Sequence, residues 1–408
     1  MDVSCYQCNT ITTIEIGFEV KNFVCPNCQS VYISDANKDL RRERSFNHKI
    51  AHVGLQIGQK GILKGIEYTV TGILTKKVYG AYYWNEYILN DNSNQFIYLS
   101  ESDGHWIFLK EIEDKFEVNN HPKFLTYEGV VMNLYDYTDV EIVSAQGFFD
   151  FTLPKKKIHS IEYINAPNMI AIEKDGDKET TYFGEHITTK EIRKGFPFFT
   201  LPPKVGTGLV QPFFLNIRNT ALVFCVVSIL ILLSHWFIYK DKLEKQVFYK
   251  DLTFDAFNNK DIVSPSFVLE GGSAPMTIAV NSGVDNSWAN VQVALLNEKT
   301  NDAVYASKDI EYYHGYTDGE SWTEGNPSEE FNICGVAAGK YHLVITPQKA
   351  PEDLQNNSLT IKAVWDQPSG RNRWLTIIFM AVLLIALYYL NVNFEQKRWE
   401  DSDNSPYN

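Results

Sequence analysis

Alternating hydrophobic and polar positions run through much of the chain and predict a mainly β protein. From Gly54 to about Phe199, short alternating runs such as "GIEYTVTGIL" and "QFIYLSESDGHWIFL" are separated by Gly, Asn and Asp, as in strands joined by turns. A second series at 262–366, from "SFVLEGG" to "SLTIKAVWD", contains enough strand-length runs for a β-sandwich. The pattern therefore predicts two separate β regions.

The first β region contains a diverged internal repeat. The run "NEYIL", followed by "FIYLSE" and "DGHW", is echoed by "IEYIN", "NMIAIEK" and "FGEHI", which makes Glu86 and Glu162 equivalent points. We expect a first β unit at 54–120 and a second at 121–200. One small sheet or barrel per copy fits this spacing, and a duplicated half of a single barrel fits it equally.

Two uninterrupted apolar stretches predict transmembrane helices at 220–239 and 374–392. Each lacks formal charge and is long enough to cross roughly 30 Å of hydrocarbon. The alternative is a buried core helix, which seldom has apolar residues on every face. We expect the neighbouring segments to be a Pro- and Gly-containing linker, a helical stalk and a tail, at 201–219, 240–261 and 393–408.

Four cysteines near the N-terminus have the spacing of a zinc ribbon, which we place at 1–36. Cys5 and Cys8 form one C-x-x-C pair, and Cys25 and Cys28 form the other after sixteen intervening residues. Ile14 to Val20 alternate in polarity, which predicts a hairpin between the pairs. Four thiolates would complete a closed tetrahedral Zn²⁺ site with a structural role, the alternatives being disulfides or an iron–sulfur centre. The polar segment 37–53 is expected to be a linker or short helix.

The charge and the cysteines suggest which partners and compartment to expect. A formal net charge of −13 disfavours nucleic acid as a partner, because the chain as a whole would repel phosphate. The first residues lack the features of a cleaved signal. Four thiols at metal spacing need a reducing compartment, so we expect an inner-membrane protein with both termini cytosolic and 240–373 exoplasmic. The lone Cys334 of the predicted sandwich has no partner for a disulfide within it.

Two further groups are candidate sites. Glu86 lies among aromatic residues and could act as an acid or base with His105, whereas the repeat at Glu162 and His186 favours a structural role. In the loop "YYHGYTDGESWTEGNPSEE", Tyr316 and Trp322 could stack on a sugar, or the nearby acids could bind calcium. The alternative for this loop is a solvated acidic turn.

His235, near one end of the first span, is expected to be interfacial rather than part of a proton relay. The sequence contains no nucleophile elbow, Walker loop, HExxH helix or dinucleotide glycine fingerprint.

The segment "GQKGILKGIEYTVTGILTKKVYGAYYWNEYIL…SESDGHW", together with "IEYINAPNMIAIEKDGDKETTYFGEHITTKEIRKGF", resembles the bacterial family called domain of unknown function 4178. The resemblance implies a cytosolic β module without an assigned activity. Because the sequence predicts interaction-type modules on both sides of a membrane and contains no catalytic constellation, we expect a membrane-anchored, non-enzymatic adaptor or sensor that has a protein partner. The alternatives are a membrane-tethered enzyme or accessory subunit that uses Glu86 and His105, and a glycan-binding sandwich.

Overall fold

The computed structural model describes residues 2–35, 39–47, 54–91, 93–196, 200–240, 245–366 and 370–407. The chain divides into two compact units. Unit 1 comprises Met1–Thr220 and Leu383–Asn408, and unit 2 comprises Ala221–Val382. Each unit is described separately below.

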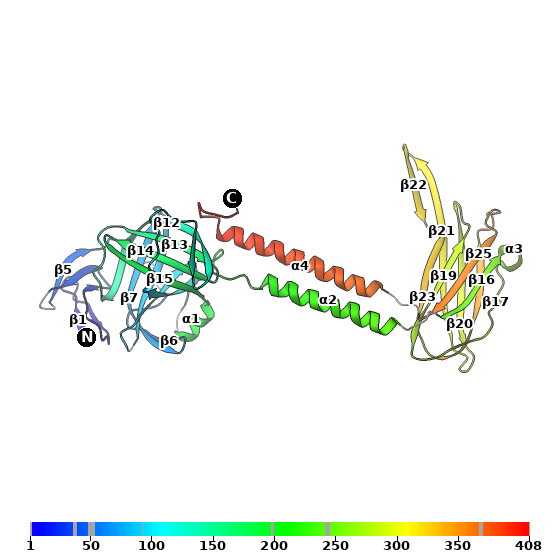
Figure 1. Cartoon of the computed structure of the whole chain (residues 1–408), viewed down its shortest axis with the longest axis horizontal. Helices are drawn as coiled ribbons and strands as arrows, with labels where there is room; N and C mark the ends of the chain where they lie inside the picture. The colour runs from blue at the N-terminus through cyan, green and yellow to red at the C-terminus, as the bar shows by residue number, and fades with distance from the viewer. Residues whose placement is uncertain are drawn as a thin grey trace. The chain divides into compact units, whose positions relative to one another are not determined.

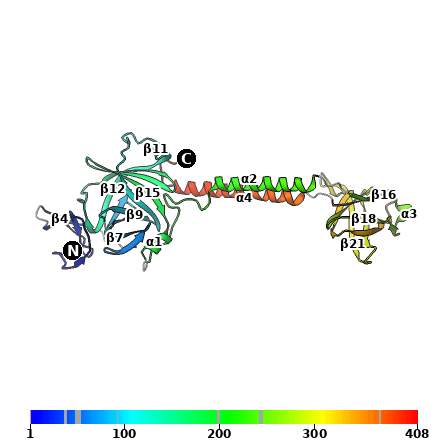
Figure 2. The ribbon, with the colours of Figure 1, turned by 60° about the horizontal axis from the view of Figure 1, so that its bottom comes forward.

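Unit 1 is built around a closed barrel of eight antiparallel strands (Figures 1 and 2). Two four-stranded meanders, β7 to β10 and β12 to β15, join because β10 pairs with β15 and β12 pairs with β7. The strands are β7 (Ile66–Val78), β8 (Tyr82–Asp91), β9 (Phe96–Ser102), β10 (His105–Ile112), β12 (Val130–Phe149), β13 (Ile158–Asn165), β14 (Asn168–Asp175) and β15 (Lys178–Ile187). The predicted units at 54–120 and 121–200 are therefore halves of one barrel, which was the second arrangement that fitted the sequence.

Apolar residues also cover the outward faces of the barrel strands. Tyr87 and Leu89 of β8 pack in a cluster with Ile192 of helix α1 (Thr189–Gly195). On the second meander, Ile161 and Ile170 pack with Leu125 of strand β11 (Phe124–Tyr127). Strand β6 (Lys60–Leu63) pairs with β7 and contacts α1. Apolar packing therefore stabilises the barrel on its outside, in addition to an apolar cluster on its inward face that includes Ile107 and Met169.

The N-terminal segment is continuous with the barrel sheet. It forms strands β1 (Asp2–Ser4), β2 (Ile11–Thr13), β3 (Asn22–Val24), β4 (Ser30–Ser34) and β5 (Leu40–Ser45). Val24 and Phe23 of β3 lie opposite Gly147 and Phe148 of β12, and Asn22 donates to the carbonyl of Tyr32 at 2.9 Å. This segment therefore extends the sheet beyond the barrel.

Two local predictions for this region were wrong. Residues 40–45 of the predicted linker form β5, which pairs with β4 because backbone hydrogen bonds are available at that sheet edge; residues 37–38 and 48–53 of that linker lie outside the described residues. Between the cysteine pairs, only 11–13 and 22–24 are strands. The alternating polarity of residues 14–20 nevertheless corresponds to alternating burial, since Ile14 and Val20 are buried and Glu15 and Glu19 are exposed.

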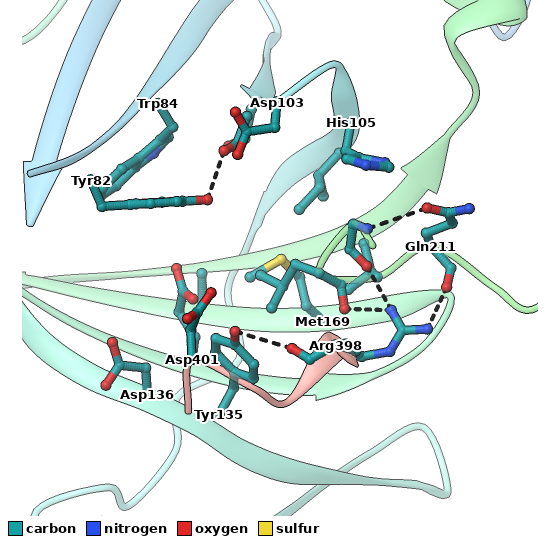
Figure 3. Close-up of a pocket in the computed structure, with 18 of the residues that line it drawn as sticks. Tyr82, Trp84, Asp103, His105, Tyr135, Asp136, Met169, Gln211, Arg398 and Asp401 are labelled. Carbon is teal, nitrogen blue, oxygen red and sulfur yellow. Dashed lines mark hydrogen bonds between the residues drawn. The ribbon is translucent and has the colours of Figure 1, made fainter. Parts of the chain in front are cut away.

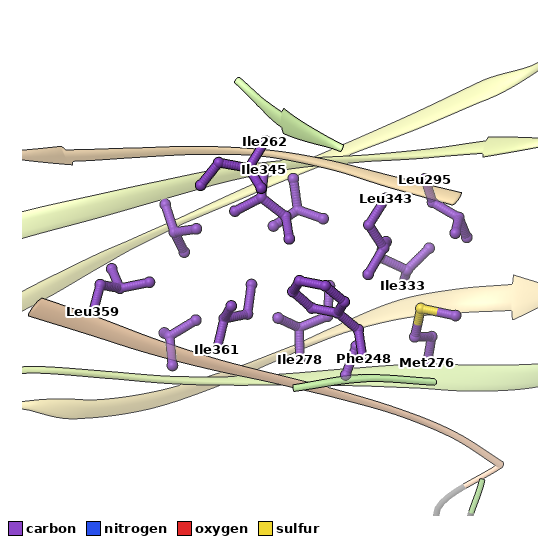
Figure 4. Packing of buried hydrophobic residues seen from close by; sticks show 14 of the residues in the cluster. Phe248, Ile262, Met276, Ile278, Leu295, Ile333, Leu343, Ile345, Leu359 and Ile361 are labelled. Atoms are coloured by element: carbon purple, nitrogen blue, oxygen red, sulfur yellow. The ribbon is translucent and has the colours of Figure 1, made fainter. Parts of the chain in front are cut away.

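Unit 2 contains the predicted β-sandwich. One sheet has the order β16, β25, β19, β23, and the other β17, β24, β20, β21, β22, with β18 paired to β24. The strands are β16 (Lys245–Thr253), β17 (Ile262–Val263), β18 (Phe267–Leu269), β19 (Ala274–Ser282), β20 (Ser287–Asn297), β21 (Ala303–Thr317), β22 (Glu320–Gly325), β23 (Ser328–Val336), β24 (Gly339–Lys349) and β25 (Ser358–Trp365). Ile278 and Ile361 of one sheet face Leu343 and Ile345 of the other in a filled apolar core (Figure 4).

The prediction of a helical stalk at 240–261 was wrong. Residues 245–253 form strand β16 on the edge of the sandwich, and only Phe254–Phe257 form a short helix, α3. Phe248 and Leu252 belong to the sandwich core, so burial of these side chains favours a strand over a continued helix. Residues 241–244 lie outside the described residues.

Two helices are long and apolar enough to cross a membrane. They are α2 (Ile217–Tyr239), of 23 residues, and α4 (Arg371–Arg398), of 28 residues. Both extend beyond the predicted spans. Within unit 2, Arg373 at the start of α4 contacts His235 near the end of α2, with 2.9 Å between Nη1 and Nδ1.

Candidate functional site

The four N-terminal cysteines converge on one point. All four sulfurs lie within 4.8 Å of one another, and the Cys5–Cys28 and Cys8–Cys25 sulfur pairs are 3.5 and 3.6 Å apart. A tetrahedron of sulfurs about 2.3 Å from a Zn²⁺ ion has edges of about 3.8 Å. The cluster therefore has the dimensions of a site that could hold a metal ion.

The two C-x-x-C turns repeat the same backbone geometry. Cys5 and Cys25 each donate their N–H to a carbonyl five residues later, at 2.9 and 3.1 Å. Asn9 and Gln29 follow the turns with positive φ angles of 58° and 56°. Cys5 and Cys25 are buried, and the cluster packs on Phe148 of β12. The cysteine cluster therefore anchors the N-terminal segment to the barrel.

A cavity of about 750 Å³ lies inside the barrel. All eight barrel strands line it, mostly through alternate residues such as Trp84 and Glu86 of β8 or Ser160 and Glu162 of β13. Because alternate residues of a strand point to the same face, this face is the interior of the barrel. The volume is in the range of small-molecule sites in proteins.

A buried ion triad stands deep in this interior. Lys76 of β7 is 2% exposed, and its Nζ lies 2.7 Å from Glu86 and 2.5 Å from Glu173. Burial by itself would lower the pKa of Lys76, but Glu173 and Glu86 raise it above its ordinary value. Burial raises the pKa of Glu86, and Lys76 opposes this shift. The triad carries one more negative than positive group when all three are ionised.

Glu162 differs from these carboxylates because it has no cation beside it. Among the described residues, no side chain donates a hydrogen bond to it or forms an ion pair with it. Burial, followed by the charges of Asp136, Glu173 and Glu86, raises the pKa of Glu162 to about 7. Its carboxyl group lines the cavity and is available to a ligand.

Two chain segments cover one end of the cavity, and we call them the roof segments: 205–211 and 397–401. Arg398, 3% exposed, joins them by donating to the carbonyls of Gly208, Leu209 and Gln211 (Figure 3). It also pairs with Glu395 at 2.9 Å.

The tail beyond α4 is fastened to the barrel as well. Trp399 is buried, and its ring packs 5.3 Å from that of Tyr135 on β12. Ser402 and Asn404 both donate to the Tyr135 carbonyl. Residues 205–211 lead into α2, and Arg398 ends α4, so both membrane-type helices are connected in sequence to the roof segments.

The predicted pair, Glu86 and His105, lines the same cavity but does not act as a pair. The Nε2 of His105 is 3.0 Å from the Val205 carbonyl, and its ring packs against Gly208, where an added Cβ would lie 2.6 Å from the imidazole. Glu86 instead bonds Lys76 and the indole N–H of Trp84, the latter at 3.1 Å. Each candidate is therefore held by a different neighbour.

The corresponding residues of the second half, Glu162 and His186, also line the cavity. Burial lowers the pKa of His105, and burial followed by the positive charge of Lys204 lowers the pKa of His186 to about 4. Both imidazoles are therefore neutral near pH 7.

The two aromatic candidates on the sandwich are exposed but face opposite sides. Tyr316 is 74% and Trp322 44% exposed. In the β21–β22 hairpin, Trp322 is paired with Gly315, and Tyr316 is paired with Ser321. Directly paired residues share a face and neighbours alternate, so the two rings cannot form one stacking platform. The Trp322 ring lies over Gly315.

Sequence reasoning missed three residues of the interior and roof. Lys76 stands in "LTKKVYG", which reads as a polar strand end, and Glu173 stands in an ordinary alternating run. Arg398 was assigned only to a tail. That Lys76 and Glu173 point into the barrel could be predicted only if the closure of the barrel were already known. No local sequence signal marks the contacts of Arg398 with the roof segments.

Comparison with known proteins supports the barrel as a unit. Residues 56–189 match the family described as Domain of unknown function (DUF4178), and this range includes every barrel strand. The chain is thus similar to that family over the barrel. A search of the curated proteins gives no match.

Solved structures resemble the chain only remotely. "Structure of PNGF-II in C2 space group" has 8% identity and a TM-score of 0.21, with 76% of this chain and 66% of that one covered, just under two thirds of its length. "Structure of infectious bursal disease virus Gt strain" has 8% identity, a TM-score of 0.18 and coverages of 88% and 72%. A structure titled as carbohydrate-binding modules from the beta-sandwich superfamily has 9% identity, a TM-score of 0.12 and coverages of 73% and 98%. Scores this low carry no argument about fold or function.

Proposed function

We propose that the protein is a membrane-anchored, non-enzymatic sensor whose barrel binds a small molecule. The cavity of about 750 Å³ enclosed by all eight strands carries this proposal. An eight-stranded barrel has room for either packed side chains or one small ligand, and here the inward face combines polar and apolar side chains and leaves space. The roof segments that close this cavity are directly connected along the chain to α2 and α4.

The way in which the cavity is closed supports a sensor function. Arg398 holds the two roof segments together through three backbone carbonyls. A ligand that enters through this end must break the hydrogen bonds of Arg398, and a bound ligand would lie beneath the roof segments. Occupancy of the barrel would then change the ordering of the segments that lead to the membrane helices, and a partner protein would sense that change.

We propose further that the cysteine cluster holds a structural Zn²⁺ ion. The sulfur separations fit a tetrahedral Cys₄ site, and four thiolates leave no position for a substrate. The need for reduced thiols supports a cytosolic barrel, with the sandwich on the other side of a bacterial inner membrane.

The enzymatic alternative has less support from the geometry. Glu86 and His105 share the cavity but are each held by other groups, Lys76 and the Val205 carbonyl. A glycan platform made by Tyr316 and Trp322 is not proposed, because the hairpin register separates the two rings.

Ligand binding is tested by filling the cavity. Ala171 of β14 lines it, so Ala171→Trp should occupy it, and the same substitution at exposed Ala337 is the matched control. The full chain in detergent is incubated with filtered cell extract and analysed by native mass spectrometry. We expect a bound small molecule in the wild type and in Ala337→Trp that is absent from Ala171→Trp. Equal occupancy in all three would contradict the proposal.

A further inference from the structure

We propose that the ligand of the barrel cavity is an organic cation, such as a small alkylammonium compound. This inference rests on the proposed function, because it assigns a chemical class to the ligand of the same cavity. The evidence for it is the distribution of charged groups and aromatic rings in the barrel interior.

The basic groups of the cavity are already neutralised or uncharged. Lys76 is bound by two carboxylates, and Arg398 is committed to three carbonyls and Glu395. His105 and His186 are neutral near pH 7, for the reason given above. Lys397, exposed on the roof, is the remaining basic residue of the lining. An anionic ligand therefore finds no free cation in the interior.

Carboxylates, in contrast, are in excess from the depth of the cavity to its rim. Seven acidic residues line or border it: Glu86, Asp103, Asp136, Glu162, Glu173, Glu400 and Asp401. Glu162 is the one that stands inside without a bonded partner among the described residues. Burial, and after it repulsion from Asp136, Glu173 and Glu86, raises the pKa of Glu162, and a cation placed beside its carboxylate would offset both effects.

Aromatic rings complete the site for an organic ion. Tyr82, Trp84 and Tyr135 all line the cavity (Figure 3), and the faces of such rings attract ammonium groups. The cavity also has apolar lining from residues such as Met169 and Ile107, which suits an alkyl chain.

A bare metal ion fits less well. Over the part of the chain that the structure describes, the four cysteines are the only group of three or more His, Cys, Asp or Glu side chains whose ligand atoms converge. The cavity carboxylates are instead distributed along its walls. Dispersed charge in a large cavity matches an extended organic cation better than a compact ion.

The experiment compares amines with neutral molecules of the same shape. The full chain in detergent is titrated calorimetrically with alkylammonium ions from propylammonium to 1,8-diaminooctane, each beside the alcohol or diol of equal length. We expect at least one amine to bind about tenfold more tightly than its alcohol, the size expected for a charge-assisted contact. Glu162→Gln should weaken that binding about tenfold, and Glu162→Asp should retain most of it. Glu141→Gln, the same change at an exposed position of β12, should leave it unchanged.

The result also separates this inference from the proposed function. Alcohols that bind as tightly as amines, or amine binding that is unaffected by Glu162→Gln in a normally folded variant, would overturn the cationic class. If Ala171→Trp still abolished binding of those alcohols, the cavity would remain a ligand site. Should no amine bind at all, the cationic class fails, and the native mass spectrometry of the cavity-filled variant decides independently whether the barrel binds a ligand.

Discussion

The barrel and the sandwich are both antiparallel β structures, but their interiors are opposite in character. Between the sandwich sheets, residues such as Ile278, Leu343 and Ile361 form one buried apolar cluster (Figure 4). In the barrel, apolar clusters cover outward faces, while the inward face combines an apolar cluster that includes Ile107 and Met169 with a buried triad, a Glu162 without a bonded partner among the described residues, and an open cavity. Alternation along a strand shows that its two faces differ, but not which face encloses the interior. The sandwich has a packed apolar core, and the barrel has the cavity on which the proposed ligand binding depends.

The largest effect is expected at the cysteine cluster, which lies outside both interiors. Cys25→Ser should abolish metal binding and unfold the N-terminal segment, because structural Zn²⁺ sites contribute about 10–16 kcal/mol to folding. Metal content per chain, measured by mass spectrometry, and proteolysis of residues 1–47 test this. Cys334→Ser in the sandwich should keep one Zn²⁺ per chain. A full equivalent of metal in Cys25→Ser would refute the Cys₄ site.

Removing the buried cation of the barrel should come next. Lys76→Met leaves Glu86 and Glu173 facing each other without a cation, which should cost about 3–5 kcal/mol. Chemical unfolding of the full chain, followed by a probe in unit 1, measures the loss. Because the two carboxyls must then protonate, the variant should regain stability as the pH is lowered. A loss below 1 kcal/mol would show that the triad is not buried as described.

A matched pair of truncations contrasts the two interiors directly. Ile361→Ala in the sandwich core removes atoms from a filled space and should cost about 2–5 kcal/mol, including the energy of a new cavity. Ile107→Ala on the barrel cavity wall adds to a space that already exists, so its cost should fall at or below the lower end of that range. Unfolding free energies of each unit give the comparison. Equal losses would mean that the barrel interior is as tightly filled as the sandwich.

The smallest effect concerns the pH dependence of Glu162. The folded-state pKa of about 7 is above the ordinary glutamate pKa of 4.5, so between these pH values the folded chain holds a proton that the unfolded chain has released. The contribution of Glu162 to the free energy of unfolding is therefore fully present below about pH 4.5 and is lost as the pH rises to about 7. The loss should be on the order of 1 kcal/mol after solvent screening. The difference in unfolding midpoint between the wild type and Glu162→Gln should follow this curve. The wild-type midpoint should therefore fall relative to that of Glu162→Gln as the pH rises from about 4.5 to 7, and a wild-type midpoint that rises relative to the variant would contradict it.

The sequence predicted the elements whose signals are local. The alternating runs predicted both β regions, the apolar stretches predicted α2 and α4, and the cysteine spacing predicted the convergence of the four sulfurs. The closure of the barrel was left open because the pairing of Trp106 with Ile187 joins residues far apart in sequence. The strand at 245–253 was missed because its two buried residues, Phe248 and Leu252, lie among charged ones.

The candidate site was only partly predictable for the same reason. Glu86, Glu162, His105 and His186 were identified, and all four line the cavity. Their actual partners come from other strands and from the roof, where Lys76, Glu173 and Val205 are brought in by the fold rather than by spacing. The opposite orientations of Tyr316 and Trp322 likewise depend on the register of one hairpin.

The central claim is that the barrel interior is a ligand site. It is tested most directly by a high-resolution electron cryomicroscopy map of the full chain, prepared in native membranes and kept with its cell extract. We predict density beside Glu162, below Arg398, that no side chain of the protein accounts for, and a solidly packed sandwich. A map in which the cavity contains only side chains of the protein, with Tyr82, Trp84 and Tyr135 packed across it and no other density, would contradict the account.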